Sequence, residues 1–136
     1  MCVINLKKSK RKRFYKVVIK YKGSYYGVYT GANFRKKGYN VAVNFMYKSK
    51  SVLELLLSGD PSRWHSPMIT GFLDLDTANE YASAFSQISE GVRRNIGVIL
   101  CQSKDSVWVG VISSNAHGHG MKAVCTERAR FVKEVI

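Results

Sequence analysis

The chain has 136 residues, an apolar fraction of 46% and only two prolines, which fits one ordered domain and excludes a disordered chain. No apolar run approaches the ~18 residues of a membrane span, and the N-terminal residues have the reverse order of a secretion signal, so we expect a cytoplasmic protein with no membrane partner. The formal net charge of +13 lies in the first fifty residues, which hold fourteen Lys or Arg and no acid, whereas residues 51–136 hold eight basic and nine acidic side chains. This asymmetry predicts a polyanionic or acidic partner.

The chain opens with a basic segment. Six of the seven positions from Lys7 to Arg13 are cations. Because like charges repel one another, we predict that residues 1–13 form a flexible basic N-terminal arm and that residues 14–136 form a single domain.

Alternating apolar and polar residues predict strands after the arm. The pattern covers Phe14–Tyr21, Ser24–Thr30 and Tyr39–Phe45. In the first of these we expect Tyr15 and its alternate neighbours to face the core, with Lys16 on the opposite face.

Two helices are predicted in the middle of the chain. Ser51–Ser58 has a serine cap and is followed by Gly59. A second helix begins near Asp76, since Thr77 and Glu80 have the spacing of a capping box. Its apolar face would be formed by Ala78, Tyr81, Ala82, Phe85 and Ile88.

The later part of the chain is rich in predicted strands. They cover Phe72–Leu75, Ile96–Gln102, Ser106–Ser113 and Lys122–Thr126, and the second and third would form a tight hairpin. Arg130–Val135 fits either a strand or a helix. We therefore predict an α+β fold with a mainly antiparallel sheet of six or seven strands and one or two helices, preceded by the basic tail.

Aromatic residues accompany the cations. Ten of the sixteen Phe, Tyr and Trp side chains lie in the first fifty residues. Cations neutralise phosphates and aromatic rings stack on bases, so the combination favours binding of nucleic acid, or of a host nucleoprotein or acidic protein surface. A solvated basic face without a partner is the alternative. The candidate contact residues are Lys7, Lys8, Lys10, Arg11, Lys12, Arg13, Lys16, Lys20, Tyr25, Tyr26, Tyr29, Arg35, Lys36, Lys37 and Trp64.

A second hypothesis is a protein-directed inhibitor that blocks a host factor by shape. In that case Tyr25, Tyr26, Tyr29 and Trp64 would be the anchors, because Tyr and Trp dominate binding hot spots. The alternative role for Trp64 is to cover the edge of the core.

A hydrolase or metal enzyme is the least favoured class. Its candidate residues would be His65, His117, His119 and Cys125, but no spacing completes a ligand set and no glycine elbow accompanies a nucleophile. We therefore expect a non-catalytic protein with no metal and no cofactor. The three cysteines form no Cys-x-x-Cys, and Cys101 and Cys125 lie in apolar runs typical of buried thiols.

Three segments resemble the small accessory proteins that bacteriophages encode. They are Phe14–Val18, Gly71–Ala82 and Ile96–Ser113. The resemblance extends over residues 14–136 and implies a viral protein that interferes with host defences, including nuclease complexes.

Overall fold

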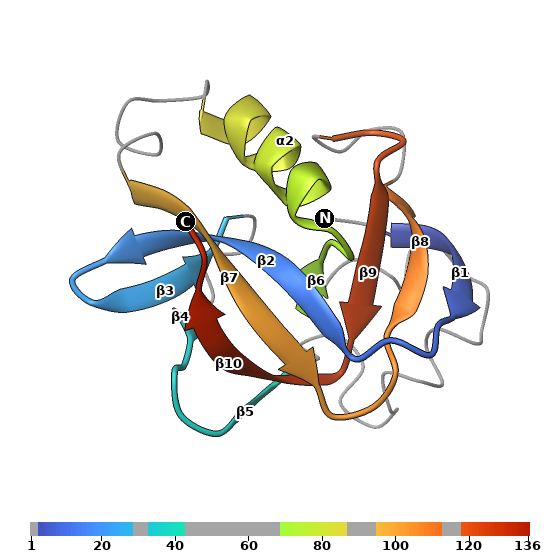
Figure 1. Cartoon of the computed structure of the whole chain (residues 1–136), viewed down its shortest axis with the longest axis horizontal. Helices are drawn as coiled ribbons and strands as arrows, with labels where there is room; N and C mark the ends of the chain where they lie inside the picture. Colours follow the sequence, from blue (N-terminus) through green and yellow to red (C-terminus); the bar gives the residue numbers. More distant parts are fainter. Residues whose placement is uncertain (1–2, 29–32, 43–68, 87–94, 113–117) are drawn as a thin grey trace.

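The computed structural model describes residues 3–28, 33–42, 69–86, 95–112 and 118–136 (Figure 1). The elements in chain order are β1 (Val3–Lys8), β2 (Arg13–Tyr21), β3 (Ser24–Gly27), β4 (Asn33–Phe34), β5 (Tyr39–Val41), β6 (Ile69–Gly71), α2 (Leu75–Ser86), β7 (Ile96–Ser103), β8 (Trp108–Ile112), β9 (Lys122–Thr126) and β10 (Arg128–Glu134).

The strands form two antiparallel sheets. One has four strands in the order β1-β8-β9-β6, and the other has six in the order β4-β3-β2-β7-β10-β5. Figure 1 shows β2, β7 and β10 side by side, with β9, β8 and β1 to their right and α2 above. The predicted α+β class is confirmed in outline, but the strands are divided between two sheets. The sequence predicted fewer strands, because β1 falls in the predicted arm and a strand as short as β4 shows no readable periodicity. β5 lies within the predicted strand Tyr39–Phe45, whereas β6 ends just before the predicted strand Phe72–Leu75.

The basic N-terminal segment is part of the four-stranded sheet. β1 pairs with β8, and the hydrogen bonds continue beyond it: Ser9 N donates to Val107 O at 3.0 Å and Val107 N donates to Arg11 O at 2.9 Å. Val3 anchors β1 because its side chain is only 4% exposed. The structure therefore differs from the predicted flexible arm. Apolar burial on one side of β1 holds the backbone while the cationic side chains extend into water.

The two sheets meet at β2. Tyr15 and Phe72 exchange two backbone hydrogen bonds of 2.7 Å, which join β2 to the residue after β6. Gly71 is needed at this junction, because a Cβ there would collide with the Phe14 ring and the Tyr15 carbonyl oxygen. A close approach of two backbones of this kind is a common reason for glycine in a strand.

Both faces of β2 are covered, so its burial does not simply alternate. Phe14 and Val18 belong to one core cluster, and Val17 belongs to a second cluster that includes Tyr81 of α2. Lys16 lies on the same face as Phe14 and Val18, where its side chain is half-buried. The prediction that this face is solvent-exposed is wrong, because a second layer packs on it.

The predicted second helix is present as α2, with a different cap. Asp74 Oδ1 accepts hydrogen bonds from Thr77 N at 2.8 Å and from Thr77 Oγ1 at 2.7 Å. Asp74 is therefore the N-cap, with Thr77 as the residue it caps. The apolar face is confirmed at the buried residues Ala78, Tyr81 and Ala82.

The predicted hairpin between residues 96–102 and 106–113 is wrong. β7 pairs with β2 and β10, whereas β8 pairs with β1 and β9. The short connection crosses from one sheet to the other because Val107 is fully buried between them and cannot serve as an exposed turn residue. The ambiguous C-terminal segment is a strand, β10, and β9 lies where it was predicted.

Several predictions fall outside the described residues. They concern the helix Ser51–Ser58 and the side chains of Tyr29, Trp64, His65 and His117. No helix in the part of the chain that the structure describes is long and apolar enough to cross a membrane.

Candidate nucleic-acid interface

Four polar side chains form a row across the six-stranded sheet. Arg13 of β2 lies directly opposite Gln102 of β7, Gln102 lies opposite Arg130 of β10, and Arg130 lies opposite Tyr39 of β5. Directly paired residues project to the same face of a sheet, so these four side chains share one face. Tyr15 and Leu100, also a direct pair, stand on that face beside Arg13 and Gln102. We call the four residues Arg13, Gln102, Arg130 and Tyr39 the arginine row.

α2 leaves this part of the sheet open. The helix packs on the section of the face that holds Val17 and Val98, against strands β2 and β7. Arg13 and Tyr39 lie beyond that section and are exposed, and Gln102 and Arg130 are half-buried. The row therefore offers a polar surface next to the helix-covered core.

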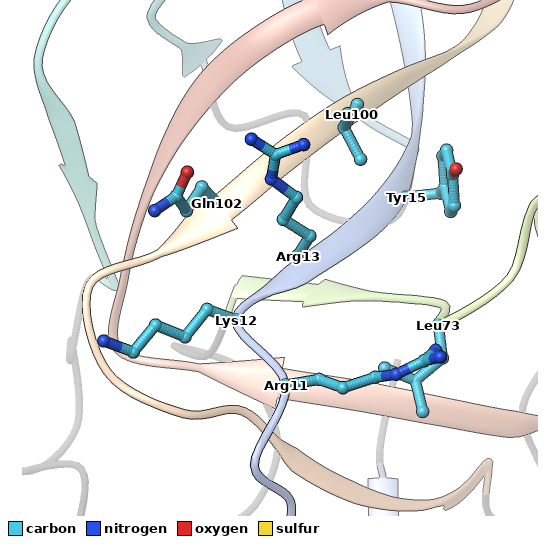
Figure 2. A pocket seen from close by; sticks show the side chains of 7 residues that line it. All are labelled: Arg11, Lys12, Arg13, Tyr15, Leu73, Leu100 and Gln102. Carbon is cyan, nitrogen blue, oxygen red and sulfur yellow. The ribbon is translucent and has the colours of Figure 1, made fainter.

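A pocket of about 460 Å³ opens at the β2 end of the row. Residues from three segments of the chain surround it, and Figure 2 shows Arg13 reaching over β7 toward Gln102 and Leu100, with Arg11 reaching toward Leu73. The lining residues are Arg11, Lys12, Arg13, Tyr15, Leu73, Leu100 and Gln102. Backbone bonds fix its rim, since Ser103 N donates to Lys12 O at 2.7 Å.

Hydrogen-bond donors dominate the polar side chains of the pocket. Arg130 Nη2 donates to Gln102 Oε1 at 3.0 Å, which engages the amide oxygen and leaves the amide nitrogen as a donor. Arg11, Lys12 and Arg13 supply only donors. The pocket is thus suited to an anionic ligand rich in acceptors.

The Asp74 carboxylate lies close enough to Arg11 for their opposite charges to interact. Hydrogen bonds from the Thr77 hydroxyl and backbone hold the pKa of Asp74 below its usual value, and the positive charges of Lys122 and Arg11 add to this. The carboxylate caps α2 and also offsets part of the positive charge of Arg11, while the three consecutive cations of the pocket rim still leave an excess of positive charge.

The structure separates the predicted cations into groups. Arg11, Lys12 and Arg13 gather at the pocket. Lys7, Lys8 and Lys10 belong to β1 and the connection after it, where the Lys8 ammonium lies 4.8 Å from the centre of the Trp108 ring. These cations belong to the other sheet or its connection.

Lys16 and Lys20 are engaged within the fold. Lys16 Nζ donates to Thr70 O at 3.4 Å, and burial lowers the pKa of Lys16. Lys20 forms an ion pair with Glu134, whose pKa is lowered mainly by the hydrogen bond from Lys20. Neither ammonium is free to neutralise a phosphate at the pocket.

The remaining predicted residues belong to β3 and to the connection from β4 to β5, where Arg35 contacts Tyr39 of β5. Tyr25 is 4% exposed and packs on the Phe131 ring at 5.4 Å, so it is a core residue and not a partner anchor. Lys36 stands 4.9 Å from the Tyr25 ring centre. Arg35 and Lys37 are exposed, and Tyr26 is half-buried.

Sequence reasoning missed Gln102, Arg130 and Tyr39. All but Tyr39 come from the near-neutral part of the chain, where a count of charges gives no signal. The alternation of Arg128 and Arg130 around the fully buried Ala129 was the available clue, because it places both arginines on one face of a strand.

The thiols and histidines form no reactive cluster in the described part of the structure. Cys101 and Cys125 are buried, and burial raises the pKa of each to about 12. His119 is exposed in a turn after Gly118. Within the described ranges, no three His, Cys, Asp or Glu side chains come together in a group that could hold a metal ion.

Comparison with known proteins gives no relative from which a function could be transferred. No family model, curated protein or solved structure matches this chain. The proposals below therefore rest on the chemistry of the site.

Proposed function

We propose that this protein is a non-catalytic nucleic-acid-binding protein that uses the pocket and the arginine row as its contact surface. The observation that supports this proposal most directly is that Arg11, Arg13 and Tyr15 line one open pocket. Guanidinium groups bind phosphate through paired, charge-assisted hydrogen bonds, and an aromatic ring beside them can stack on a base.

The distribution of charge supports this function. The cations of the pocket rim are consecutive in the chain, and their backbone is held by hydrogen bonds to residues around β7 and β8. Because the backbone of these cations is already fixed, they lose less conformational entropy on binding than the cations of a flexible arm would lose. The setting that we propose is a viral accessory protein acting on nucleic acid or on a host nucleoprotein complex.

The test is the salt dependence of binding, measured by fluorescence anisotropy with a labelled single-stranded oligonucleotide. We expect log K to fall linearly with log salt concentration, because bound cations release counterions from phosphates. The double variant Arg11→Gln/Arg13→Gln should lower the magnitude of the slope by about 1.4, from about 0.7 for each lost contact to a single strand.

Lys22→Gln is the matched control for loss of charge. Lys22 is exposed at the opposite end of β2, about 30 Å from Arg13 at the usual rise per strand residue. It should leave the slope nearly unchanged. A binding constant that does not change with salt concentration would contradict the proposal. Equal changes of the salt slope in the Lys22 variant and in the pocket variant would also contradict it.

A further inference from the structure

We infer that the ligand is single-stranded, with one unpaired nucleotide in the pocket and the adjoining phosphates along the arginine row. This inference rests on the proposed function and narrows it to one class of nucleic acid.

The first argument is the shape of the site. Its volume of about 460 Å³ is in the range of pockets that hold a small molecule. A duplex presents phosphates on a convex surface and keeps its bases stacked inside. A base reaches a pocket only after it has left the stack, which costs least when the nucleic acid is already single-stranded.

The second argument is the apolar part of the lining. The half-buried Tyr15 and Leu73 contribute surfaces that phosphate would not use, while the third apolar lining residue, Leu100, is only 7% exposed. The flat faces of a base match such surfaces, and stacking on an aromatic ring tolerates any base. Tyr15 is well fixed for this task, because its backbone is paired with Phe72 on one side and with Leu100 on the other.

The third argument is the pattern of donors. Arg130 engages the Gln102 amide oxygen, so the pocket presents the amide nitrogen together with the guanidinium groups of Arg11 and Arg13. An unpaired base exposes carbonyl and ring-nitrogen acceptors that would otherwise pair with a second strand. The donors of the pocket can therefore take the place of that strand.

The arginine row gives the direction of the bound strand. Neighbouring β-strands lie about 4.8 Å apart, so the backbones at Arg13 and Arg130 are separated by about 10 Å, with Gln102 between them. The next step across the sheet reaches Tyr39, and Arg35 Nη2 donates to the Tyr39 carbonyl oxygen at 3.3 Å. A single strand leaving the pocket would cross β7, β10 and β5 in that order.

The experiment compares two probes, a labelled oligothymidylate and a blunt-ended duplex of the same length, at one salt concentration. We expect the single strand to bind at least about tenfold more tightly. Tyr15→Leu should weaken binding of the single strand about tenfold, the effect of one lost stacking contact, and change duplex binding little. Tyr21→Leu is the matched control, since Tyr21 is 54% exposed at the far end of the same strand.

Arg130→Gln provides a second variant that does not depend on the packing of Tyr15. It should weaken single-strand binding and lower the magnitude of its salt slope by about 0.7. Equal affinity for both probes, or no effect of either variant on the single strand, would overturn the single-strand inference while the proposed function stands. Failure to bind either probe would overturn the proposed function itself.

Discussion

The ammonium group of Lys16 donates a hydrogen bond to the backbone oxygen of Thr70 at 3.4 Å. Lys16 belongs to β2 of the six-stranded sheet, and Thr70 belongs to β6 of the four-stranded sheet. A cation that the sequence placed on the binding surface therefore bridges the two sheets, at a position where burial disfavours its charge.

Replacement of this lysine should weaken neither the fold nor the binding of nucleic acid. In Lys16→Met we expect the free energy of unfolding near neutral pH to stay unchanged or to rise by about 1 kcal/mol, because an apolar chain of similar length replaces a half-buried charge. The measurement is urea unfolding, together with the anisotropy assay. A loss of affinity as large as that of Arg11→Gln/Arg13→Gln would contradict this internal role.

The pH dependence gives a second test of Lys16. Its folded pKa is lowered from the usual 10.5, so the unfolded chain holds the proton more tightly and the charge opposes folding below the folded pKa. Stability from this group therefore rises as the pH climbs from the folded pKa toward 10.5. Lys16→Met should lack that rise, and an identical pH profile in both proteins would count against it.

Asp74 should contribute to stability as a helix cap. Asp74→Ala removes the acceptor for Thr77 and is expected to lower the free energy of unfolding by about 1 kcal/mol. Because the folded pKa of Asp74 is lowered, this contribution is present above the unfolded pKa and is lost as the pH falls through the folded value. Urea unfolding at neutral and acid pH measures the difference. Asp76→Ala, in the same turn, keeps the cap and should cost less.

Deletion of residues 1–8 should destabilise the protein. It removes β1, leaves β8 with one partner, and loses the burial of Val3, for an expected cost of at least about 2 kcal/mol. Lys7→Gln/Lys8→Gln removes the same two charges and keeps the strand. Its cost should stay within about 1 kcal/mol, most of it from the Lys8 contact with Trp108. Equal midpoints of thermal unfolding for the deletion and the full chain would show that β1 is dispensable.

Cys101 and Cys125 should resist thiol reagents while the protein is folded. With pKa values of about 12, about one thiol in ten thousand is ionised near pH 8, and both side chains are buried. In a Cys2→Ser background we expect almost no colour with an aromatic disulfide until denaturant is added, and then two equivalents. Rapid reaction of the native protein would contradict the buried assignment.

Local patterns predicted many of the elements. The alternation in residues 14–21 identified β2, and the polar start followed by the spaced apolar residues identified α2. Local patterns did not predict which strands pair. The near-continuous apolar run of β7 is typical of a strand covered on both faces, yet only its partners β2 and β10 show that it lies inside the larger sheet.

For the candidate site, too, the sequence predicted the residues that are neighbours in the chain and did not predict those brought together by strand pairing. The charge count identified Arg11, Lys12 and Arg13, because they are neighbours in the chain. It also included Lys16 and Lys20, since the sequence does not show that one is half-buried and the other paired with Glu134. Arg130 joins the site only through register with Gln102, a long-range relationship.

The order in which the chain visits the two sheets has a consequence for folding kinetics. The chain passes from the smaller sheet at β1 to the larger at β2, and it changes sheet again at β6, β7, β8 and β10. Asn40 and Ala129, which share a hydrogen bond, are 89 positions apart. No continuous fragment contains all the strands of one of these two sheets without strands of the other, so loops must close over most of the chain before either sheet is finished. We therefore expect slow folding in a single concerted transition, and a chain cut between β6 and β7 should recover structure only when both pieces are mixed.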